Sequence, residues 1–144
     1  MGKTNWKRVF LGGVVAGILL LVLGTATTSI LLKQWTPVME SLGHPLSGVF
    51  SVGDVIFGIV FSLILGLMAV WLYSAIRPRY GVGPKTAVIA GLIVWIFHSL
   101  FVSRYSLSVF DLFPFSVVVI DSLAFLVMYV IATLAGAWVY KEQE

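Results

Sequence analysis

Four long hydrophobic stretches run along this chain, each bounded by charged residues or by proline and glycine. They cover residues 9–32, 51–76, 86–103 and 115–139. A helix rising roughly 1.5 Å per residue crosses a hydrocarbon core of roughly 30 Å in about 20 residues. Because a helix satisfies its own backbone hydrogen bonds in lipid, the pattern predicts an all-α, polytopic membrane protein. We expect four transmembrane helices in an up-down bundle.

Composition supports this interpretation and limits the chemistry. With 60% hydrophobic and 10% charged residues, the chain cannot cover a soluble surface. Its 144 residues are expected to form one transmembrane domain, residues 1–144, because four crossings leave little material for a soluble module. The chain has no cysteine, which excludes disulfides, thiolate metal sites and a cysteine nucleophile.

The basic residues predict the orientation. With a cytoplasmic N-terminus, seven of the nine lie inside (Lys3, Lys7, Arg8, Arg77, Arg79, Lys85 and Lys141) and two outside (Lys33 and Arg104). Both termini are therefore predicted to be cytoplasmic. The net charge of +3 is explained by basic ends that face anionic lipid headgroups, so we expect membrane lipids as partners and no nucleic acid.

Small residues recur at spacings that place them on one face of each predicted helix. They are Gly13, Gly17, Gly58, Ser62, Gly66, Ala87, Gly91, Ala132 and Gly136. Membrane helices associate largely through close packing at such residues. The pattern predicts helix packing, either inside one bundle or between copies in a homo-oligomer.

Few ionisable residues fall within the hydrophobic stretches, and such residues are often functional. Asp54, His98, Arg104 and Asp121 are predicted to form a polar cluster toward the outer side. Three interpretations remain open. The cluster is a structural ion pair that fixes helix register, a proton or cation relay through His98, or a site where His98 ligates a haem or pigment.

The connection between the second and third stretches holds two prolines, two glycines and three cations. Pro78 is predicted to end the second helix and Pro84 to begin the third. Arg77, Arg79 and Lys85 are predicted to face lipid headgroups. No nucleophile elbow, metal-ligand spacing or phosphate-binding loop is found in the sequence, so we expect no enzyme, metal or cofactor.

Three segments carry a resemblance: residues 5–13 (NWKRVFLGG), 71–81 (WLYSAIRPRYG) and 136–141 (GAWVYK). In these segments the chain resembles a family of small uncharacterised bacterial integral membrane proteins with no known activity. The resemblance implies a multi-pass protein of the bacterial cytoplasmic (inner) membrane.

The sequence favours a non-enzymatic packing or accessory subunit of a larger or homo-oligomeric membrane assembly. The alternative is an oligomeric transporter or channel, linked to protons or cations, that uses the outer-leaflet Asp/His cluster. A relay needs a wet polar path, and the inner halves of the predicted helices offer only serine, threonine and glycine. This comparison favours the packing role.

Overall fold

The computed structural model describes residues 4–41, 43, 51–100 and 115–141, and every regular element among them is a helix. These elements are α1 (Trp6–Ser41), α2 (Val52–Tyr80), α3 (Pro84–Trp95), the π-helical turn η1 (Ile96–Leu100) and α5 (Phe115–Val139). The predicted all-α class is confirmed.

Three of the helices are long and apolar enough to cross a membrane: Trp6–Pro37 of α1, Val52–Tyr80 and Phe115–Val139. The fourth predicted crossing, formed by α3 and η1, is a shorter apolar helix over Pro84–Ser99. The chain is therefore a helical, multi-pass membrane protein.

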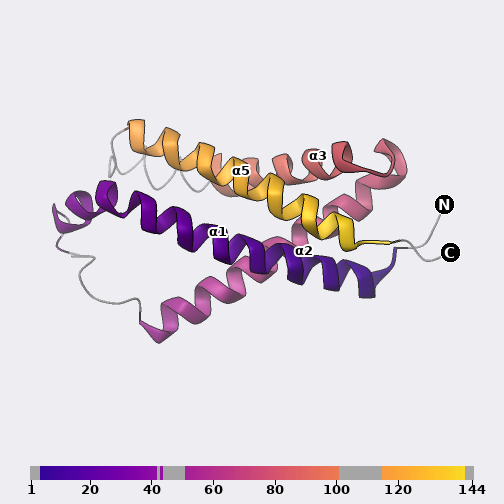
Figure 1. Cartoon of the computed structure of the whole chain (residues 1–144), viewed down its shortest axis with the longest axis horizontal. Helices are drawn as coiled ribbons and strands as arrows, with labels where there is room; N and C mark the ends of the chain where they lie inside the picture. Colours follow the sequence, from indigo (N-terminus) through magenta and orange to yellow (C-terminus); the bar gives the residue numbers. More distant parts are fainter. Residues whose placement is uncertain (1–3, 42, 44–50, 101–114, 142–144) are drawn as a thin grey trace.

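Helix α1 has the most extensive contacts, with α2 on one side and α5 on the other, and α3 packs mainly on α5. Figure 1 shows α1 and α2 crossing near their middles, with the start of α1 and the end of α5 at the same end of the molecule. Beyond the crossing, toward the other end, the first half of α2 leans away from α1. The first half of α2 and the second half of α1 therefore diverge beyond the crossing.

Glycines produce the close crossing of α1 and α2. A Cβ added at Gly66 of α2 would overlap the backbone of Gly13 and Gly17 on α1. The backbones thus touch where side chains are absent, which is the form of packing that stabilises helix pairs in lipid. Helix α5 packs beside this crossing, where a Cβ added at Gly136 would lie 2.7 Å from the carbonyl oxygen of Gly12 on α1 and would also meet Val70 of α2.

The predicted end of the first helix, at residue 32, is wrong, because α1 continues to Ser41. The hydropathy pattern locates the apolar part of a helix, whereas backbone hydrogen bonds continue through polar side chains. Thr36 illustrates this, since it is still helical and its hydroxyl donates to the carbonyl of Leu32 at 2.7 Å. Pro37 also lies inside the helix.

The predicted end of the second helix, at residue 76, is also wrong. Helix α2 continues through Pro78 to Tyr80 and ends at Gly81, whose φ of 85° favours glycine. The N–H of Gly81 donates to the carbonyl of Arg77 at 2.9 Å. A proline removes its own N–H donor and crowds the carbonyl four residues before it. It leaves the N–H groups of the following residues intact, so the last turn can still form after Pro78.

The third predicted helix, residues 86–103, begins two residues earlier, at Pro84, and this first-turn proline confirms the predicted start signal. Its α-helical part ends at Trp95, and the π-helical turn η1 follows. Residues 101–103 lie outside the described residues. The fourth predicted helix coincides with α5.

Candidate functional site

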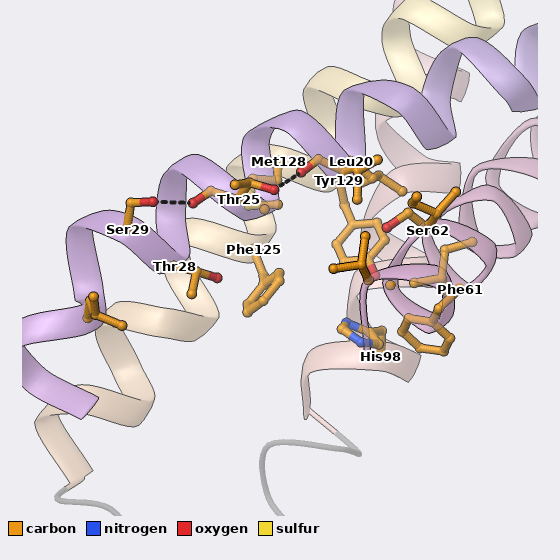
Figure 2. A pocket seen from close by; sticks show the side chains of 17 residues that line it. Leu20, Thr25, Thr28, Ser29, Phe61, Ser62, His98, Phe125, Met128 and Tyr129 are labelled. Carbon is orange, nitrogen blue, oxygen red and sulfur yellow. Dashed lines mark hydrogen bonds between the residues drawn. The ribbon is translucent and has the colours of Figure 1, made fainter. Parts of the chain in front are cut away.

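A cleft of about 710 Å³ opens on the side where α2 leans away from α1. We call it the His98 cleft. Its walls come from α1, α2, η1 and α5. Figure 2 shows Phe61, Phe125 and Tyr129 around His98, with Thr25, Thr28 and Ser29 farther away along α1. Prominent among the lining side chains are Leu20, Thr28, Phe61, Ser62, His98 and Phe125.

The cleft exists because the small-residue contact of α2 does not continue past the crossing. A Cβ added at Gly58, two turns before Gly66, would meet no atom within 4 Å. Gly58 lines the cleft instead of touching α1. It was expected to be a packing residue, and the structure gives it no close neighbour.

The imidazole of His98 sits among three aromatic rings. Its centroid lies 5.5 Å from that of Phe61, 5.6 Å from that of Phe125 and 5.5 Å from that of Tyr129. Figure 2 shows Phe61 and Phe125 on opposite sides of the ring. Nδ1 of His98 is buried and has no hydrogen-bond partner among the described residues. The Nδ1 atom of His98 is therefore a polar group without a described partner among aromatic rings.

Three hydroxyl-bearing residues of α1 line the cleft, Thr25, Thr28 and Ser29, and two of them hydrogen-bond within the helix. Thr25 donates to the carbonyl of Leu21 and Ser29 to that of Thr25, both at 2.8 Å. Such bonds to the preceding turn are the usual way a hydroxyl is satisfied in a membrane helix. These two residues therefore contribute little free donor capacity to the cleft.

The π-helical turn that carries His98 is fixed to α5 by its neighbour Trp95. The indole Nε1 of Trp95 donates to the carbonyl of Ser122 at 2.9 Å. A π-helical turn rotates the following side chains relative to an α-helix and is frequent at functional sites. The hydrogen bond and the turn together hold the histidine at the cleft.

The members of the predicted polar cluster occupy different surroundings. Asp54 is exposed and forms a capping box at the start of α2, where its carboxylate accepts from the N–H of Ser51 at 2.9 Å and from its hydroxyl at 2.7 Å. Asp121 is buried, and its Oδ1 has no hydrogen-bond partner within the described ranges. Arg104 lies outside the described residues.

No hydrogen bond or ion pair joins Asp54, His98 and Asp121 within the described part of the chain. That part also contains no group of three histidine, aspartate or glutamate side chains suited to a metal ion. The contacts of His98 are instead with aromatic rings. These residues therefore do not form the continuous chain of polar contacts that a proton or cation relay needs.

The remaining small residues lie at helix contacts. A Cβ added at Gly91 would lie 3.0 Å from both the hydroxyl of Thr133 and the carbonyl oxygen of Tyr129, which brings α3 against α5. Ala87 and Ala132 are each 1% exposed.

A second cavity, of about 750 Å³, lies between the end of α2, the start of α3 and the end of α5. Arg77 lines it, and its guanidinium carbon lies 5.4 Å from the ring centroid of Tyr140. Arg79 and Lys85 are exposed nearby in sequence. The three cations predicted to face headgroups thus cluster at one end of the bundle.

The aromatic residues around His98 were not predicted from the sequence. Phe125 and Tyr129 are spaced i, i+4 and so share one face of α5. That spacing was a usable signal. The contribution of Phe61 was not predictable, because it depends on the angle at which α2 crosses the bundle.

Comparison with protein-family models, with curated proteins and with solved structures finds no significant match to this chain.

Proposed function

We propose that the protein is a non-enzymatic module of the bacterial inner membrane that acts by associating with a second copy of itself through the open half of α2. All four hydrophobic stretches cross the membrane in this proposal, and both termini are cytoplasmic. The excess of basic residues predicted on the inner side supports this orientation. The start of α1 and the end of α5 lie at one end of the molecule, which is compatible with an even number of crossings (Figure 1).

The observation that carries the proposal is the exposure of α2. Within an 18-residue apolar window, 17% of α2 is buried inside the chain, compared with 33% of α1 and 28% of α5. Although α2 packs closely on α1 at the glycine crossing, most of its surface in this window is not buried by the chain and is available to lipid or to another subunit.

One row of α2 side chains faces away from the bundle. Val52, Ile56, Val60 and Ile64 are spaced by four residues and are all exposed, from 77% at Val52 to 48% at Ile64. We call this row the outer face of α2. In a symmetric dimer the outer face of one copy would pack on the same face of the other. A partner of a different sequence is the alternative occupant.

A cysteine-free chain makes the test direct. Val60→Cys places a thiol on the outer face, and Val127→Cys places one on α5, where Val127 is similarly exposed at 54% against 49%. In oxidised native membranes we expect a disulfide-linked dimer of the Val60→Cys protein and a monomer of the Val127→Cys protein. Equal cross-linking of both, or of neither, would contradict self-association through α2.

A further inference from the structure

We propose that the His98 cleft binds a lipid-soluble molecule whose ring carbonyl accepts a hydrogen bond from the imidazole, the chemical class to which membrane quinones belong. The cleft is separate from the outer face of α2. Its lining includes Val55, Gly58, Ile59 and Ser62, whereas the outer face contains Ile56, Val60 and Ile64. The two proposals can therefore fail independently.

The volume of the cleft selects a small molecule over a protein helix. At about 710 Å³, it lies within the roughly 300–1,000 Å³ of small-molecule sites. A transmembrane helix of about 30 Å length and 10 Å diameter occupies roughly 2,400 Å³. A helix would therefore not fit without rearranging the bundle, while a substituted ring fits with part of an alkyl tail.

The position of the cleft requires a ligand that is soluble in lipid. Its walls are formed by segments that include all three long apolar helices. His98 lies 14 residues after Pro84, or roughly 20 Å along the helix axis. The ester carbonyls of phospholipids stay near the headgroups, whereas a free ring with an alkyl tail reaches this depth.

The hydrogen bonding of His98 indicates that the ligand carries a hydrogen-bond acceptor. Nδ1 is enclosed and has no partner among the described residues. A neutral imidazole carries one proton, on one of its two nitrogens. A proton on Nδ1 would be an enclosed donor without an acceptor, so we place the proton on Nε2. The ring is only partly buried and lines the cleft. It can therefore offer Nε2–H to a carbonyl oxygen in the cleft.

The aromatic side chains that line the cleft favour a planar ligand. Phe61 and Phe125 both line the cleft and lie on opposite sides of the imidazole (Figure 2). Aromatic rings pack favourably in offset or edge-to-face arrangements. A quinone ring that accepts from His98 would lie beside these two phenyl groups.

The test uses the purified full chain in mild detergent and measures quenching of tryptophan fluorescence by decylubiquinone. Trp95 precedes His98 by three residues and provides a nearby reporter. Decylbenzene, which has a ring and the same tail but no carbonyl, is the competitor. We expect saturable binding of the quinone and about tenfold weaker competition by decylbenzene, since one net hydrogen bond changes affinity by up to about tenfold.

Three variants complete the experiment. His98→Phe keeps an aromatic ring but removes the donor, and should weaken quinone binding about tenfold. Gly58→Leu places a side chain in the cleft, where an added Cβ meets nothing within 4 Å, and should abolish binding. Val127→Leu, on an exposed position of α5, should leave binding unchanged.

Unsaturable quenching, equal affinity for quinone and decylbenzene, or unchanged binding by His98→Phe would each overturn the proposal. If His98→Phe does not fold, Gly58→Leu decides the question. Undiminished binding by a folded Gly58→Leu protein would show that the quinone does not occupy the cleft.

Discussion

Replacing one glycine at the crossing of α1 and α2 should destabilise the bundle, whereas the same replacement two turns away should not. In Gly66→Ala, the new Cβ would lie 2.6 Å from the Cα of Gly17. Ordinary carbon–carbon contacts begin at about 3.5 Å, so α1 and α2 would have to separate by about 1 Å. The obstructing atoms belong to the α1 backbone and cannot move aside as a flexible side chain would.

The control is Gly58→Ala in the same helix, where the new Cβ meets no atom within 4 Å. Both changes gain the same intrinsic helix preference of alanine over glycine, about 1 kcal/mol. The difference between the two variants therefore isolates the steric cost. Overpacking typically costs about 1–3 kcal/mol, and we expect Gly66→Ala to be less stable than Gly58→Ala by that amount.

The free energy of unfolding can be measured by titrating sodium dodecyl sulfate into mild-detergent micelles while following helical circular dichroism. The expected order is Gly58→Ala equal to or above wild type, with Gly66→Ala below both. Equal stability of the two variants would refute the glycine-mediated contact between α1 and α2.

Three further substitutions test local contacts by the same unfolding assay. Ser51→Ala removes the N-cap of α2 and should cost about 1 kcal/mol, with faster amide exchange confined to the first turn; unchanged exchange there would argue against the capping box. Trp95→Phe loses the hydrogen bond from α3 to α5 and should cost about 0.5–1.5 kcal/mol; no loss would contradict that link. Thr86→Val removes a donor to the carbonyl of Gly81 at 2.7 Å and should cost about 1 kcal/mol; a neutral result would mean that the turn before α3 does not need this bond.

The apolar pattern predicted the existence of the helices better than their ends. Helix α5 agrees with the prediction because the sequence has Pro114 directly before it and a charged residue soon after its end. The ends of α1 and α2 were wrong because they depend on backbone hydrogen bonding and on Gly81, whose positive φ terminates α2. Hydropathy does not report either property.

The candidate site was only partly predictable. The sequence drew attention to His98, because an ionisable side chain within an apolar stretch is costly. It also aligned Gly58 with Gly66 on one face, but only the crossing angle determines that α1 touches Gly66 and leaves Gly58 open. The cleft follows from that divergence, which no local pattern encodes.

The central claim is that the chain crosses the membrane four times, with the short α3–η1 segment as the third crossing. In the cysteine-free chain, single cysteines at Ser51, Val82, Phe115 and Lys141 can be labelled with a membrane-impermeant thiol reagent. We expect labelling of Ser51→Cys and Phe115→Cys in cells with an open outer membrane and intact inner membrane. Val82→Cys and Lys141→Cys should react only after the inner membrane is permeabilised. Protection of Phe115→Cys together with Val82→Cys would mean that α3 and η1 do not cross, and would contradict the account.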